Sequence, residues 1–281
     1  MIISPFTPLF FEDFSSDGIE SRYIQVFASS DQILLECLCA PGESFSGFAV
    51  IGTTDDGQSQ YSQLSHNSWT MADGCVLWFT VISGLVPGIY QVLNTGKGIT
   101  SHLFRVTNDP AELAKTTLIQ YSMKDNRQRQ DAVFIIDGMR YFFDFRVPGG
   151  FKDSGWTFAV ENEQFITPDA DPVELFALES TQKKFTMGSQ EGVPVHFAEM
   201  LNRLLTCSYV YFDGVRYARK DSAVPEMNVQ IEGLDSFVFT QLLQKVNNLN
   251  PTIETSNHLI MRRVNETSYR STSGTDNRII K

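Results

Sequence analysis

The stretch RYIQVFASSDQILLECLC, residues 22–39, places two apolar runs on either side of the polar turn signal SSDQ. Apolar runs of this length that contain β-branched and aromatic residues favour strands. Similar runs follow and are GFAVIGT (47–53), CVLWFTVIS (75–83), IYQVLN (89–94) and SHLFRV (101–106). Short strands separated by Gly, Pro and Asp turns predict an N-terminal β-sandwich or barrel over residues 22–108.

The second half of the chain combines strand patterns with helical ones. An Asp-Gly pair at 213–214, between two strand-like runs, predicts a tight hairpin. In VPVHFAEMLNRLLT (193–206) the apolar residues recur at helical spacing, and a second amphipathic helix is predicted at about 235–247. Residues 109–250 are therefore predicted to form an α+β domain, an antiparallel sheet with two amphipathic helices, within a mostly β chain.

Both ends of the chain differ from these two predicted domains. Residues 1–21 are apolar at first and are interrupted by prolines, so we expect an ordered arm that packs on this subunit or on a neighbour. Residues 251–281 are polar, with five basic and three acidic side chains, and we expect an extended C-terminal tail. Its net positive charge suits an acidic neighbour, but a solvated terminus is the preferred explanation.

The composition excludes several classes of function. With 22 basic and 33 acidic residues the net charge is −11, which argues against direct nucleic-acid binding. No apolar stretch reaches the length of a membrane span, so we expect no membrane insertion. The four cysteines and four histidines show no metal-ligand spacing, and nucleophile-elbow and phosphate-loop motifs are missing. We therefore expect no metal, no cofactor and no catalytic residues, and hence no enzyme.

Arginines on predicted strands are the candidates for contacts between subunits. In RYFFDFRV (140–147) Arg140 and Arg146 alternate with aromatic residues, which would give the strand a polar and an apolar face. Such a strand at a subunit seam would offer guanidinium groups to an acidic neighbour, and an exposed strand face of a single chain is the alternative. The other interface candidates are Arg216, Arg219, Arg262 and Arg263.

Aromatic residues are abundant, with 22 Phe, 9 Tyr and 3 Trp. Tyr61 and Trp69 in the first predicted domain are candidates for stacking against a sugar, together with Trp78 and Tyr90. Core packing is the competing explanation, since Trp78 lies inside a continuous apolar run. Tyr61 and Trp69 are retained as glycan-binding candidates.

One set of motifs resembles a known family. The stretches are FRVPGGF (145–151), FTMGSQEGVPVHFAEMLNRLLTC (185–207) and SYVYFDGVRYARKDSAVPEMNVQ (208–230). They resemble structural proteins encoded by tailed phages and prophages of gut anaerobic bacteria, and the likeness covers about the second half of the chain. The matching positions are Thr186, Gly188, Gly192, Val193, Pro194, Asn202, Cys207, Gly214, Arg216, Tyr217 and Arg219.

The resemblance implies a structural component of a virion tail or baseplate, similar to distal-tail ring proteins and assembled in the host cytoplasm. Its partners would be further copies of the chain in a ring of unknown order, and other tail proteins. The alternative is a glycan- or cell-surface-binding β-sandwich module, which could bind a host surface glycan. The resemblance implies no catalytic residue.

Overall fold

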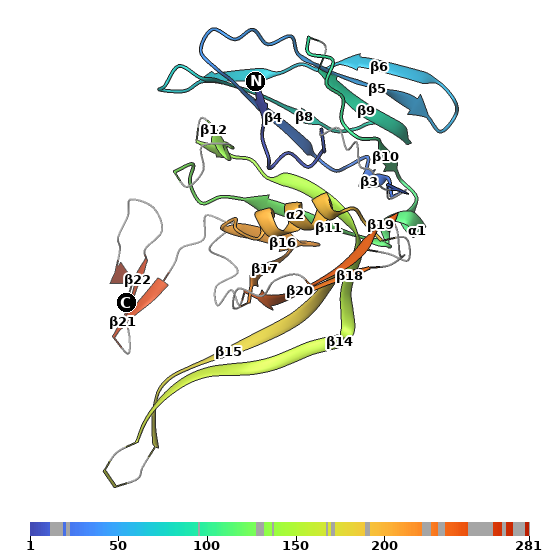
Figure 1. Cartoon of the computed structure of the whole chain (residues 1–281). Coiled ribbons are helices and arrows are strands. Elements are labelled where there is room, and N and C mark those ends of the chain that lie inside the picture. The colour runs from blue at the N-terminus through green and yellow to red at the C-terminus, as the bar shows by residue number, and fades with distance from the viewer. Residues whose placement is uncertain are drawn as a thin grey trace. The chain divides into compact units, whose positions relative to one another are not determined.

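The structure is a computed structural model of the chain (Figure 1). It describes residues 1–11, 19–20, 23–94, 96–127, 132–136, 138–166, 168–169, 172–188, 192–220, 226–229, 234–246, 261–265, 268–271 and 279–280. The chain divides into two compact units, Met1–Lys245 and Val246–Lys281. The second unit contains a small antiparallel sheet of β21 (Met261–Asn265), β22 (Ser268–Ser271) and β23 (Ile279–Ile280).

Two sheets built from the first part of the chain pack into a sandwich. One sheet has the order β1 (Ile2–Ile3), β4 (Ile33–Cys39), β8 (Val76–Ile82) and β7 (Asn67–Thr70). The other has the order β3 (Gln25–Ala28), β10 (Phe104–Thr107), β9 (Gly88–Asn94), β5 (Phe48–Thr54) and β6 (Ser59–Gln63). Alternate residues of β4 and β9, such as Leu35 and Val92, fill the core between the sheets.

A third sheet of seven strands carries the second half of the chain. Its order is β15 (Pro172–Met187), β14 (Phe143–Ile166), β11 (Thr116–Ser122), β16 (Tyr209–Phe212), β17 (Val215–Arg219), β20 (Phe237–Lys245) and β18 (Glu226–Val229). The helix α2 (Val195–Leu204) buries Phe197, Leu201 and Leu204 on its apolar face. The only other helix among the described residues is the single turn α1 (Pro110–Leu113), and neither is long and apolar enough to cross a membrane. The mostly β class predicted from the sequence is confirmed.

The sandwich and the seven-stranded sheet share one hydrophobic core. Leu34 and Phe79 of the four-stranded sheet belong to the same buried cluster as Tyr121 of β11 and Leu201 of α2. Because side chains alternate along a strand, β4 sends one set of residues into the sandwich and the other set toward the seven-stranded sheet. Both faces of β4 are therefore covered by parts of the same chain.

The N-terminal arm lies against its own chain over the described residues 1–11. Strand β1 pairs with β4, and Phe6 is fully buried in the shared core. The Tyr121 hydroxyl donates a hydrogen bond to the Phe6 carbonyl, and Arg203 Nη1 of α2 donates to the Pro5 carbonyl at 2.8 Å. Of the two partners expected for the arm, its own subunit is the one that this part contacts.

The predicted helix at 235–247 is wrong, because the chain forms strand β20 there. Its apolar residues suit a helical face, but in the structure burial alternates along the strand, and Phe239, Gln241 and Leu243 are buried on one face. Strand β20 pairs with β15, β17 and β18, and these long-range ladders override the local helical pattern.

Two strands between residues 54 and 75 were not predicted. They are β6 and β7, the edge strands of the two sandwich sheets. All five residues of β6 are exposed, and three of the four residues of β7 are exposed. A strand that buries almost nothing lacks the apolar signal from which strands are predicted.

Gly192 precedes α2 in a backbone conformation with φ of 69°, where a Cβ atom would lie 2.3 Å from Ser236 Oγ and 2.9 Å from Phe237 N. Gly214, in the turn between β16 and β17, has φ of 78° and open space around it. We expect Gly214→Ala to lower the free energy of unfolding by about 1–2 kcal/mol, through the left-handed backbone alone. Gly192→Ala is expected to lower it further, because the clash is added. Urea denaturation of both variants measures this, and equal losses would contradict the packing argument.

Candidate functional site

The most prominent surface feature of the first unit is the long hairpin formed by β14 and β15. Its root belongs to the seven-stranded sheet, since β14 pairs with β11 from Phe143 to Pro148 and β15 pairs with β20 from Gln182 to Met187. Beyond this root the two strands pair only with each other in the part of the chain that the structure describes, as far as Ile166 and Pro172. We call residues 156–181 the ribbon; in Figure 1 it runs away from the sheet.

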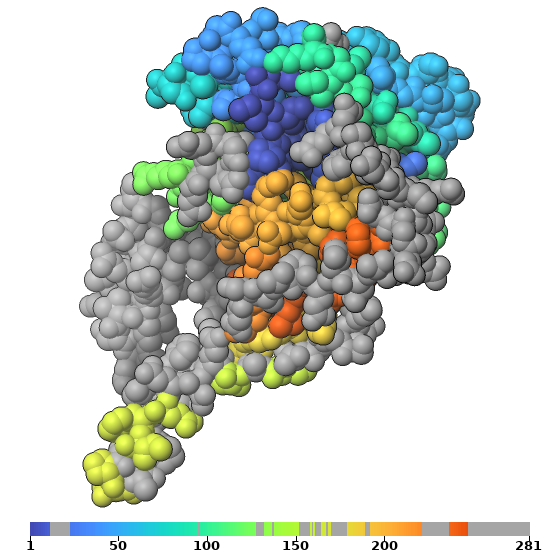
Figure 2. Space-filling model, viewed as in Figure 1, coloured from blue at the N-terminus to red at the C-terminus, as the bar shows by residue number. Residues whose placement is uncertain are grey.

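The ribbon combines exposed apolar side chains with negative charge. Phe158 is 77% exposed and Ile166 is 67% exposed, and Val160 and Phe165 are also more than half exposed. Figure 2 shows yellow-green atoms of this hairpin beyond the orange surface of α2. The sequence of the ribbon contains six acidic residues and no basic one, and the acidic residues are Glu161, Glu163, Asp169, Asp171, Glu174 and Glu179. A protein partner with basic and apolar groups suits such an element.

Two of the predicted interface arginines meet at one tyrosine. The guanidinium carbon of Arg140 lies 4.6 Å from the ring centroid of Tyr209, and that of Arg216 lies 4.7 Å from it. Arg216 Nη2 also donates a hydrogen bond to the Ser208 carbonyl at 2.9 Å. Stacking on an aromatic ring orients guanidinium groups without neutralising their charge. The pair therefore places two guanidinium groups at one tyrosine ring.

Arg146, a third interface candidate, is used inside the chain. It is 9% exposed, and its Nε and Nη2 atoms donate to the Asp31 carboxylate at 2.7 and 2.9 Å. Asp31 lies in the turn between β3 and β4, whereas Arg146 belongs to β14. This bidentate ion pair therefore connects the sandwich to the seven-stranded sheet.

The other interface candidates lie elsewhere. Arg219 Nη2 of β17 donates a hydrogen bond to Asn202 Oδ1 of α2. Arg262 and Arg263 belong to β21, where they pair across the ladder with Arg270 and Tyr269 of β22. The structure thus brings together Arg140 and Arg216 among the six arginines predicted from the sequence.

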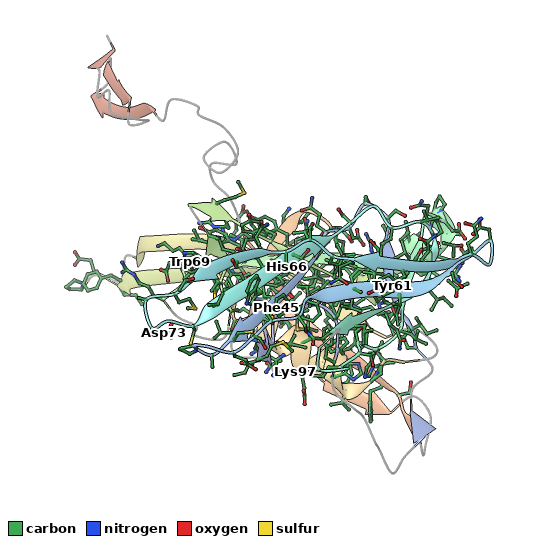
Figure 3. All side chains as sticks on the ribbon, turned by 90° about the horizontal axis from the view of Figure 1, so that it is seen from above. Phe45, Tyr61, His66, Trp69, Asp73 and Lys97 are labelled. Carbon is green, nitrogen blue, oxygen red and sulfur yellow. The ribbon has the colours of Figure 1, made fainter. Side chains whose placement is uncertain are left out.

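The two glycan-binding candidates do not belong to one sheet (Figure 3). Tyr61 on β6 is 64% exposed, and its hydroxyl donates to Gln63 Oε1 at 3.2 Å. Trp69 on β7 is partly buried and packs against the core that the sandwich shares with the seven-stranded sheet. That these residues bind a glycan stays a prediction.

The structure also contains a cluster of three aromatic rings that the sequence did not predict. Phe45 and Trp78 stack with ring centroids 4.8 Å apart and an interplanar angle of 23°, and the exposed His66 ring lies 5.0 Å from each of them. Phe45 and His66 lie in polar loops, so neither has the alternation that marks a strand residue. Only the folded sandwich brings these three rings together.

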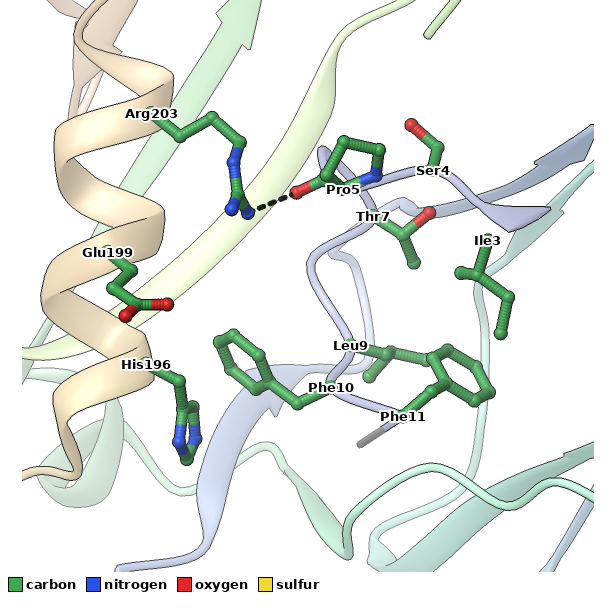
Figure 4. A pocket seen from close by; sticks show the side chains of 10 residues that line it. All are labelled: Ile3, Ser4, Pro5, Thr7, Leu9, Phe10, Phe11, His196, Glu199 and Arg203. Atoms are coloured by element: carbon green, nitrogen blue, oxygen red, sulfur yellow. Dashed lines mark hydrogen bonds between the residues drawn. The ribbon is translucent and has the colours of Figure 1, made fainter. Parts of the chain in front are cut away.

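A pocket of about 180 Å³ lies between the N-terminal arm and α2 (Figure 4). His196, Glu199 and Arg203 line it from α2, and Phe10 faces them from the arm. Local sequence patterns do not predict this pocket, because the arm and the helix are almost two hundred residues apart.

The pocket combines a neutral histidine with hydroxyl groups that are hydrogen-bonded within the chain. Burial, with a smaller effect from the nearby His102, lowers the pKa of His196 to about 4, so its imidazole is neutral near pH 7. The hydroxyls of Ser4 and Thr7, which also line the pocket, accept hydrogen bonds from the backbone N–H groups of Phe6 and Glu36. Among the described residues no group of three or more His, Cys, Asp or Glu side chains is placed to hold a metal ion.

Comparisons with protein-family models, with curated proteins and with solved structures find no match to this chain.

Proposed function

We propose that this chain is a structural subunit of a phage virion tail or baseplate that assembles with further copies of itself into a ring. The observation that carries the proposal is the ribbon, a two-stranded element whose outer edges pair with no other described strand and whose large apolar side chains are exposed. An isolated two-stranded hairpin is at best marginally stable in water, and exposed strand edges invite pairing with another chain. A neighbouring subunit would cover it.

The positions that carry the family resemblance support a structural role. A hydrogen bond between Arg219 and Asn202 connects β17 to α2. At Gly192 any larger residue would clash with Ser236. These residues hold the helix and hairpin in place, as expected for a scaffold whose job is to present surfaces to neighbours.

The oligomeric state of the purified chain tests the proposal. We expect mass photometry and negative-stain electron microscopy to show a closed multimer. Replacing residues 158–181 by an Asn-Gly turn between Thr157 and Gln182, which are paired in the hairpin, should yield a monomer with little change in melting temperature.

A wild-type chain that stays monomeric up to its solubility limit would overturn the proposal. Mass spectrometry of purified phage particles tests the location independently, since a tail component must be present in every particle. Absence of the chain from the particles would contradict the assignment to a virion.

A further inference from the structure

We propose that the ribbon of one copy docks on the positively charged surface around Tyr209 of a second copy. This inference rests on the proposed function and names the contact that would build the ring. The surface, which we call the cationic patch, consists of Lys124, Arg140, Tyr209 and Arg216. The occupant is residues 156–181 of a neighbouring chain.

The cationic patch is assembled from three separate parts of the chain. Arg140 ends β13 (Met139–Arg140), and its Nη2 atom lies 3.5 Å from the Lys124 carbonyl, which places this lysine beside it. Arg216 comes from β17 and shares the Tyr209 ring with Arg140. Lys124 and Arg140 are exposed and Arg216 is half-buried. The described acidic residue Asp125 follows Lys124 in the chain, and its carboxylate accepts a hydrogen bond from the Arg127 backbone N–H.

The ribbon complements this patch in charge and in polarity. Its six carboxylates suit the guanidinium groups, which bind carboxylates through paired hydrogen bonds. Its exposed phenylalanines suit the Tyr209 ring and the aliphatic stems of the arginines and lysine. Opposite charges across an interface also select the register and orientation of the partner.

The geometry favours a second copy over the same chain. Strand β15 leaves the seven-stranded sheet at Gln182, and its far end at Pro172 is ten residues away, or about 33 Å at the rise of a strand. Tyr209 and Arg216 belong to β16 and β17 of the same sheet. In Figure 1 the far end of the paired strands β14 and β15 lies farther from β16 and β17 than their root does.

A contact between two different surfaces is heterologous. An open row of subunits then keeps one unused ribbon at one end and one unused patch at the other end until it closes on itself. This arrangement generates a ring when the rotation between neighbours closes.

Charge reversal with rescue tests the contact on the full chain. We expect Arg140→Glu to raise the dissociation constant of self-association at least about 10-fold in sedimentation velocity, and the double variant Glu161→Lys/Glu163→Lys to do the same. Lys115→Glu is the matched control, because it makes the same charge change at an exposed residue near α1. The chain that combines Arg140→Glu with the two ribbon changes should recover self-association.

The outcomes distinguish failure of this contact from failure of the proposed function. A wild-type multimer whose dissociation constant is unchanged by the reversals overturns this contact but leaves the proposed ring intact. Dissociation by Arg140→Glu without recovery in the combined variant also overturns it, because the patch then binds something other than the ribbon. A monomeric wild-type chain overturns the proposed function as well. Circular dichroism spectra and melting temperatures equal to those of the wild type exclude unfolding as the cause of dissociation.

Discussion

Replacing Arg146 by Met should lower the free energy of unfolding by about 3–5 kcal/mol, since it leaves the Asp31 carboxylate buried without its partner. The structural cause is the two-pronged contact of 2.7 and 2.9 Å between a β14 side chain and the β3–β4 turn. The same seam contains Asp144, which accepts hydrogen bonds from Gln32 N and Gln120 Nε2, both at 2.9 Å. Urea denaturation, followed by intrinsic fluorescence, measures the loss.

Arg105→Met provides the matched control for this prediction. Arg105 also contacts two carboxylates, Asp55 at 3.6 Å and Glu112 at 3.3 Å, but all three groups are about one-third exposed or more. Exposed ion pairs contribute about 0–1 kcal/mol, so this variant should stay close to the wild type. Equal losses in the two variants would show that burial of the Arg146–Asp31 pair is not the cause.

Removing the carboxyl group of Glu36 should abolish a large pH dependence of stability. Glu36 lies on β4 and is fully buried, and its Oε2 atom accepts a hydrogen bond from Val133 N at 3.3 Å. Burial raises the pKa of this carboxyl from 4.5 to about 8, although the Val133 hydrogen bond opposes the shift. The folded protein therefore keeps Glu36 protonated in a pH range where the unfolded chain ionises it.

The sign of the effect follows from proton binding. Between pH 4.5 and about 8 the folded state holds one more proton at Glu36 than the unfolded state, so this group lowers stability as the pH rises. The expected slope is about −1.4 kcal/mol per pH unit. Relative to the wild type, Glu36→Gln should gain stability steadily from pH 5 to pH 8, because a neutral amide replaces the carboxyl group at all pH values.

Glu43→Gln is the control at a carboxyl with the opposite shift. Hydrogen bonds, first that from Lys97, lower the pKa of Glu43 to about 2. This carboxyl is ionised in both states between pH 5 and 8, so its replacement should not alter the slope in that range. Denaturation curves at several pH values test both variants, and parallel stability profiles for wild type and Glu36→Gln would refute the assignment.

Several parts of the fold follow from local sequence. The apolar run at residues 33–39 predicts β4, and the helical spacing after Pro194 predicts α2, because each pattern reflects which side chains of one short segment are buried together. The Asp-Gly pair predicts the turn between β16 and β17, where Asp213 and Gly214 have φ of 47° and 78°. That Arg140 and Arg216 contact another subunit stays a prediction.

The tertiary structure alone decided the rest. Residues 237–245 satisfy a helical and a strand pattern at once, and pairing with β15, β17 and β18 selects the strand. Asp31 and Arg146 are 115 residues apart, so their ion pair depends on how the sheets pack against each other. The same is true of Arg140 and Arg216 at the Tyr209 ring. Local propensity acts over a few residues, whereas these contacts exist only after distant segments have been packed against each other.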